Sequence, residues 1–277
     1  MAEIDGNQRI LTTQAELDRI FAKMERDYDA LNRKQQAYAI REIGRVRGEL
    51  ADMLAEYADS DGIIKRRRAN MLLRDLDEIE KSLRKYGTVA LENIIEESTE
   101  WTTAKVAGAL GIAYSATQFD RINKHVFNYV VKRYGSDGLV LSDRVWGLSG
   151  EIRDEISTVL RSSIIKGEGI NAMIPQIRKV YDNETWKIRR LARTESVTAH
   201  RAATSYNARE SDVVKWVQFH DGTCGRKDHH RHKCYELAQE DKYGKGAGVY
   251  KPTDTEIWMP HPNCSSYISY ILDERWL

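Results

Sequence analysis

The sequence predicts a mostly α-helical protein that ends in a small α+β lobe. All four prolines and all three cysteines lie beyond residue 174, so the chain has two regions of different composition. In the first region apolar residues recur at steps of three and four, which is the period of a helix. After about residue 212 they alternate as in strands. We therefore predict a helical docking arm over residues 1–138, a second helical region over 139–212 and a small Cys/His lobe over 213–277.

The first 138 residues are predicted to form amphipathic helices. Thr13 and Glu16 match a capping box, in which each side chain bonds the backbone N–H group of the other residue, so a helix is expected to start here. Gly87 is expected to end a later helix. Gly108 and Gly111 indicate either close helix packing or a flexible joint. The predicted apolar helix faces lie within residues 17–31, 37–57, 72–86 and 119–130.

Residues 139–212 are also predicted to be helical. Ser142 begins a helix whose apolar positions continue to Leu160 at helical spacing, and Gly167-Glu-Gly169 then interrupts the chain. Asn171 and Asn183 each stand where an N-cap residue is expected. We therefore predict a short helix after the first asparagine and a separate, longer helix after the second.

A small sheet closed by loops is predicted for the C-terminal lobe. Residues 213–219 alternate in strand fashion, with Val214, Trp216 and Gln218 expected on one face. Residues 267–272 also have strand composition, and Asp221-Gly222 is a turn signal between the two.

The charge balance excludes several classes of protein. The chain has 43 basic and 42 acidic residues, so it lacks the strongly basic composition of a dedicated nucleic-acid coat. One run of like charge, Lys65-Arg66-Arg67-Arg68, fits either a solvated helix start or a phosphate-binding patch. We expect no secretory signal and no membrane span, because no long apolar run occurs. Three cysteines are too few for a secreted fold built on disulfides.

Cysteine and histidine gather in the C-terminal lobe. A loop-rich lobe of this size has little apolar material, and a structural Zn²⁺ bound by thiolate and imidazole would supply the missing stability. The alternative is three reduced, partly buried cysteines with surface histidines. If zinc binds, the loop histidines His229, His230 and His232 are spare, lie beside the ligands or are solvated. The predicted ligands are Cys224, Cys234, His261 and Cys264.

The order of motifs in the second half resembles the phage head morphogenesis family, the Mu F-like minor head proteins. The motifs that carry this resemblance are Leu191-Ala-Arg-Thr-Glu-Ser, Trp216, Asp221-Gly-Thr-Cys224, Cys234-Tyr-Glu-Leu and His261-Pro-Asn-Cys264. The resemblance covers roughly residues 140–272. It implies that Arg193, Thr194, Glu195, Trp216 and Asp221 are signature residues with a structural and not a catalytic role.

Two departures from the family pattern affect the metal ligands. The family has a tight Cys-x2-Cys pair, whereas here Lys227 holds the second position and Cys234 follows after an insertion. The last family cysteine is Ser266 in this chain, which makes His261 the natural fourth ligand.

The resemblance implies a structural minor head (minor capsid) protein and no enzyme. Such a protein acts in prohead assembly at the portal and capsid interior and in DNA packaging or delivery. Its expected partners are the portal protein and capsid or scaffold proteins, with weak DNA contact and self-association as further options and no membrane. Its expected location is the virion interior near the portal, after assembly in the host cytoplasm.

Two other functions are alternatives. A metal-dependent nuclease of the HNH type would use Asp228-His229-His230 and Asn263, with a histidine activating water. A DNA-binding module would use the cations of residues 65–68 together with the mildly basic segment of residues 151–209.

Overall fold

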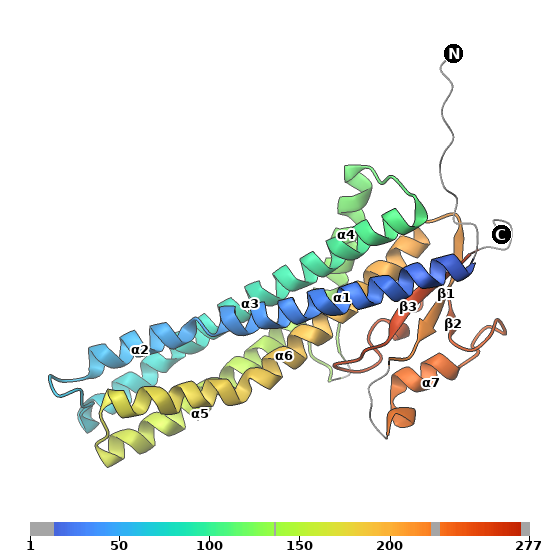
Figure 1. Ribbon diagram of the computed structural model, residues 1–277. Helices are drawn as coiled ribbons and strands as arrows, with labels where there is room; N and C mark the ends of the chain where they lie inside the picture. Colours follow the sequence, from blue (N-terminus) through green and yellow to red (C-terminus); the bar gives the residue numbers. More distant parts are fainter. Residues whose placement is uncertain (1–13, 136, 223–227, 273–277) are drawn as a thin grey trace. The chain divides into compact units, whose positions relative to one another are not determined.

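The computed structural model describes residues 14–135, 137–222 and 228–272 (Figure 1). Helices hold 72% of the described residues and strands 7%, and the strands form a small sheet near the C-terminus, so the predicted fold class is confirmed. The helices are α1 (Gln14–Ile43), α2 (Val46–Tyr57), α3 (Arg66–Leu110), α4 (Ala116–Lys132), α5 (Leu141–Lys166), α6 (Ile170–Arg209) and α7 (Lys233–Gln239). The strands are β1 (Val214–His220), β2 (Val249–Tyr250) and β3 (Tyr267–Leu272), and short 3-10 helices lie at His229–Arg231 and Thr255–Ile257.

The described chain forms two compact units, each assembled from separate stretches of sequence. Unit 1 contains residues 14–33, 94–130 and 193–272, and unit 2 contains residues 34–93 and 131–192. Each of the four crossings between the units falls inside a helix, namely α1, α3, α4 and α6. The boundaries between regions that the sequence predicted at residues 138 and 212 remain predictions.

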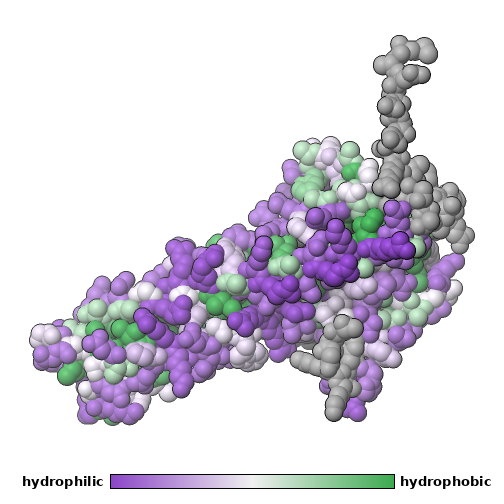
Figure 2. Space-filling model, viewed as in Figure 1, coloured by the Kyte–Doolittle hydropathy of each residue, from purple (hydrophilic) through white to green (hydrophobic). Residues whose placement is uncertain are grey.

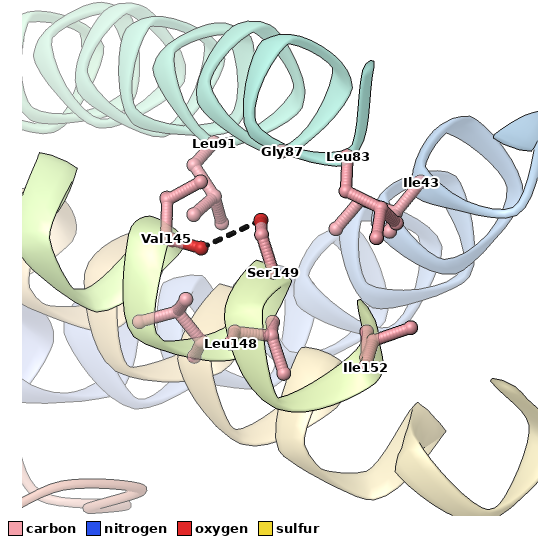
Figure 3. A pocket seen from close by; sticks show the side chains of 9 residues that line it. Ile43, Leu83, Gly87, Leu91, Val145, Leu148, Ser149 and Ile152 are labelled. Atoms are coloured by element: carbon pink, nitrogen blue, oxygen red, sulfur yellow. Dashed lines mark hydrogen bonds between the residues drawn. The ribbon is translucent and has the colours of Figure 1, made fainter. Parts of the chain in front are cut away.

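Unit 2 is helical, and a glycine lets two of its helices approach closely. Gly87 was expected to end a helix, but α3 continues through it to Leu110, so this prediction is wrong. A Cβ atom at Gly87 would lie only 3.0 Å from Cγ1 of Val145 on α5, so the missing side chain makes room for Val145. Figure 3 shows the apolar side chains around this contact, with the Ser149 hydroxyl donating a 2.8 Å hydrogen bond to the Val145 carbonyl.

Two other local signals have a different outcome from the predicted one. Helix α6 is continuous over Ile170–Arg209, so the predicted break before Asn183 is wrong. Pro175 is the sixth residue of this helix, beyond the first four whose N–H groups lack helical partners, so it costs one backbone hydrogen bond near the helix start and the helix continues through it. Gly111 follows the end of α3 with φ of +66°, whereas a Cβ at Gly108 would touch nothing within 4 Å. Gly111 therefore follows the helix end, and neither glycine packs closely against a neighbour.

The sheet of unit 1 is antiparallel in the order β2-β1-β3. Strands β1 and β3 confirm the two predicted strand segments. One side of β3 packs on helices of the same unit: the rings of Tyr270 and Phe21 on α1 are 4.6 Å apart, and the Tyr270 hydroxyl donates to the Thr204 carbonyl on α6. This packing holds the sheet, and with it the C-terminal loops, against α6.

A polar cluster lies in the helical core of unit 1. Ser196 on α6 is fully buried, and its hydroxyl is 2.6 Å from the Tyr28 hydroxyl, 2.8 Å from the Asn32 amide nitrogen and 3.1 Å from the Ser98 hydroxyl. The cluster therefore joins α1, α3 and α6 by hydrogen bonds in place of apolar contacts.

The surface in Figure 2 is mostly hydrophilic, with small apolar areas between charged side chains. Among the described residues, no helix combines the length and the apolar character needed to cross a membrane.

Candidate metal centre

Three potential metal ligands meet in unit 1. One ligand atom from each of His232, Cys234 and His261 lies within 4.8 Å of the other two. The sequence predicted Cys234 and His261 as ligands, whereas His232 was one of three loop histidines without an assigned role. A soft divalent cation with a preference for nitrogen and sulfur is the kind of ion that this donor set fits.

The start of α7 places two of these donors together. His232 is the N-cap residue of α7 with an extended backbone (φ −82°, ψ 143°), and Cys234 is the second residue of the helix. The thiol is buried, with 2% of the residue exposed. The turn into the helix brings the His-x-Cys pair to one side, and this two-residue spacing is the signal that sequence reasoning passed over.

The hydrogen bonds of His261 fix which nitrogen is available to a metal. Its Nδ1 lies 3.0 Å from the Pro262 carbonyl oxygen, which can only accept, so Nδ1 carries the proton and donates it. The other nitrogen, Nε2, faces the sulfur of Cys234 at 3.0 Å. A metal-binding histidine shows the same pattern, with one N–H held by a carbonyl and the second nitrogen directed at the ion.

Cys264 completes a pair of interacting thiols. It is 2% exposed and hydrogen-bonds to the side chains of Cys234 and His261. The hydrogen bond between the thiols lowers the pKa of Cys264 and raises that of Cys234, so the two sulfurs share a proton that favours negative charge on Cys264. The hydrogen bond with Cys264 also raises the pKa of His261.

A tight turn presents His261 and Cys264 on the same side. Asn263 has φ of 58°, a left-handed conformation that asparagine tolerates better than most residues. Its backbone N–H donates to the hydroxyl of Thr194 on α6 at 3.0 Å. A residue of the Ala-Arg-Thr-Glu signature thus fixes the turn that carries two predicted ligands.

Three further signature residues, Glu195, Asp221 and Trp216, also lie in unit 1. Glu195 is fully buried beside Thr194, so this part of α6 is not a solvent-exposed polar face. Gly222, next to Asp221 at the turn after β1, packs so closely that a Cβ atom there would lie 2.3 Å from the backbone carbon of Ser265. Trp216 on β1 packs against Tyr243, with ring centroids 5.3 Å apart.

The remaining predicted ligand and loop histidines have different outcomes. Cys224 lies outside the described residues, as does the side chain of His229. His230 is exposed and is not part of the group of three donors. The group of three donors therefore contains two of the four predicted ligands, Cys234 and His261, together with His232, and Cys264 is not one of the three.

Most of the basic run in unit 2 has local partners. Lys65 pairs with Asp59 at 3.4 Å, the Arg66 guanidinium donates to the Ile165 carbonyl at 3.0 Å, and the Arg68 guanidinium donates to the Tyr57 carbonyl at 3.1 Å. Arg67 is exposed. Three of the four cations thus serve the contacts around the start of α3, which favours the interpretation as a solvated helix start.

No family model, curated protein or solved structure matches the chain. The resemblance to minor head proteins consequently depends on the sequence motifs alone.

Proposed function

We propose that this protein is a structural minor head protein of a phage, which acts at the portal and capsid interior during prohead assembly. The observation that supports this proposal is the contact between Thr194 and Asn263, which are 69 residues apart. Two separate motifs of the resemblance are thereby parts of one structural element in unit 1. Independent motifs that matched by chance have no physical reason to contact one another in the fold.

We further propose that the lobe binds a structural Zn²⁺ through Cys234, His261 and Cys264, with His232 as the fourth donor. A tetrahedral site with Zn–S of about 2.3 Å and Zn–N of about 2.0 Å places nitrogen and sulfur about 3.5 Å apart. The 3.0 Å separation of His261 Nε2 and Cys234 Sγ is close to that value, so a small movement accommodates the ion. Four protein ligands leave no position for water, which fits a structural and not a catalytic role.

Surface features of unit 2 support protein partners. Trp146, Ile165 and Trp186 are 54%, 66% and 55% exposed. Large exposed apolar side chains are typical of contact surfaces, and the net charge of +1 gives no strong attraction to DNA. The partners that we propose are the portal protein and capsid or scaffold proteins, with weak DNA contact and self-association as secondary interactions. The proposed location is the head interior near the portal.

Co-expression with the portal protein encoded in the same gene cluster tests the assembly role. We expect the portal protein to co-purify with the wild-type chain, and the double variant Trp146→Ala/Trp186→Ala to retain less of it at equal expression. The variant Met71→Ala is a matched control, because Met71 is also exposed (58%) but lies on α3. Portal protein that elutes alone, together with assembled heads that lack this chain, would reject the proposal.

A plasmid assay tests the absence of enzyme activity. With Mg²⁺, Mn²⁺ or Zn²⁺ present, the purified protein should leave supercoiled plasmid intact. Cutting that disappears in His230→Ala would instead support the nuclease alternative. DNA binding that falls steeply with rising salt concentration, and that becomes weaker when residues 66–68 are replaced, would support the DNA-binding alternative.

A further inference from the structure

Arg201 on α6 is a buried cation that holds both ends of the loop carrying His261 and Cys264. Only 1% of the residue is exposed. Its Nε–H group donates to the Trp258 carbonyl at 2.7 Å, and Nη1 donates to the Ser266 carbonyl at 2.9 Å. Trp258 and Ser266 flank the two ligands in the sequence, so a single planar guanidinium fixes where the ligand loop begins and ends.

The charge of Arg201 has no carboxylate partner within ion-pairing distance among the described residues. A buried charge costs several kcal/mol unless hydrogen bonds or an opposite charge compensate it. The hydrogen bonds from Nε and Nη1 to carbonyl and hydroxyl oxygens satisfy these N–H groups but supply no negative charge.

Ser266 connects Arg201 to the sulfur of Cys264. Nη1 of Arg201 lies 2.7 Å from the Ser266 hydroxyl oxygen, which must accept because a guanidinium can only donate. The serine's own proton is then free to point to the Cys264 sulfur, 3.0 Å from the same oxygen. The Ser266 backbone N–H donates to this sulfur as well, at 3.4 Å. Both groups of Ser266 therefore contact the Cys264 sulfur and fix its position relative to Arg201.

We propose that Arg201 and Ser266 are positioning residues of the metal centre, which hold the loop of His261 and Cys264 in place and orient the Cys264 sulfur for a soft divalent cation such as Zn²⁺. This inference rests on the proposed metal site. The resemblance places a cysteine of the family at position 266. In this chain the residue at that position donates a hydrogen bond to a neighbouring ligand and is not itself a ligand.

Zinc affinity in a set of matched variants tests the proposal. Arg201→Met removes the charge at similar side-chain length. Arg201→Lys keeps the charge but loses the planar guanidinium group, and Ser266→Ala removes only the connecting hydroxyl. We expect competition with a chromophoric chelator to show about 10- to 100-fold weaker zinc binding in Arg201→Met and Ser266→Ala, the usual loss when a hydrogen-bond partner of a ligand is removed. Arg201→Lys should lie between these variants and the wild type. Arg209→Met, an exposed change on the same helix, is the control and should bind zinc like the wild type.

A cobalt spectrum separates a role at the metal from a role in packing. Hydrogen bonds to a thiolate alter its donor strength, so the thiolate-to-cobalt absorption band should shift in Ser266→Ala and Arg201→Met but not in Arg209→Met. Zinc affinities within about twofold of the wild type in both Ser266→Ala and Arg201→Met, with an unshifted band, would overturn the inference.

Folding defects also give a defined answer. If Arg201→Met is unfolded at low zinc, excess Zn²⁺ should restore its helical circular dichroism, because a ligand that binds the folded state stabilises it by mass action. Failure to recover at any zinc concentration, with normal zinc binding by Ser266→Ala, would show that Arg201 only supports the core. A wild-type protein that binds no zinc would refute the metal site itself. If the wild type binds zinc and the variants bind it equally well, only the positioning role of Arg201 and Ser266 is refuted.

Discussion

Replacing Ser196 by alanine should lower the free energy of unfolding by about 2 kcal/mol. The buried Ser196 hydroxyl hydrogen-bonds to Tyr28, Asn32 and Ser98 at 2.6 to 3.1 Å. At about 1 kcal/mol of net stabilisation for each hydrogen bond, the change removes about 3 kcal/mol. The higher helix propensity of alanine returns about 0.5 kcal/mol. Tyr28 keeps its second hydrogen bond, to the Ser196 carbonyl at 2.7 Å, which limits the loss.

Ser205 provides a control on the same helix. It is as fully buried as Ser196, but its hydroxyl has no hydrogen-bond partner among the described residues. Alanine at this position removes an unsatisfied hydroxyl and improves helix propensity, so Ser205→Ala should leave the stability unchanged or raise it by up to about 1 kcal/mol.

Urea denaturation followed by helical circular dichroism measures both variants at one fixed zinc concentration. The wild type and the two variants should have equal m-values, so that differences in midpoint report differences in stability. If Ser196→Ala and Ser205→Ala unfold within about 0.5 kcal/mol of each other, the hydrogen bonds of the cluster contribute nothing net and the reasoning from them is wrong.

Three further predictions concern other parts of the chain. Gly222→Ala should destabilise unit 1 by about 2 kcal/mol or more, because its Cβ would clash with the Ser265 backbone, whereas Gly108→Ala, with open space around it, should be neutral or stabilising in thermal melts. Two hydrogen bonds from Arg144 lower the pKa of Asp137 to about 2. The ionised Asp137 side chain therefore stabilises the folded state fully above pH of about 4, and this stabilisation is lost as the pH falls through about 2. Because the Asp137 side chain is 48% exposed, Asp137→Asn should cost less than about 1 kcal/mol in urea denaturation at pH 7, and no loss at pH 7 would refute the pairing. A strong chelator should lower the melting temperature, added Zn²⁺ should restore it, and an unchanged melting curve would contradict a structural metal.

The helical spacing of the apolar residues predicted the helices well, but it did not predict where the helices end. A glycine or an asparagine ends or caps a helix only if the surrounding structure does not favour continuation. At Gly87 the packing of Val145 uses the missing side chain, and at Asn183 the helix α6 continues, so both local signals gave wrong boundaries. Gly111 has no such packing and does follow the end of a helix.

The site was predictable where the residue types are rare and not where they are common. The scarcity of cysteine and the His-Pro-x-Cys turn were enough to point to Cys234 and His261, two of the three donors that the structure brings together. His232 stood among three histidines of equal appearance, and only the turn into α7 distinguishes it. Arg201 gave no signal, because a buried arginine in a helix looks like any solvated one until its partners on a distant loop are known.

The chain passes from one unit to the other four times, each time within a helix, and this has a consequence for synthesis on the ribosome. Unit 2 has all its residues once residue 192 has emerged, so it can close while the chain is still growing. Unit 1 needs residues 14–33 from the start of the described chain and residues 193–272 from its end, so the first two thirds of α1 wait for almost the whole protein. We therefore expect the lobe with the candidate metal ligands to fold last, on a chain whose other unit can already be complete.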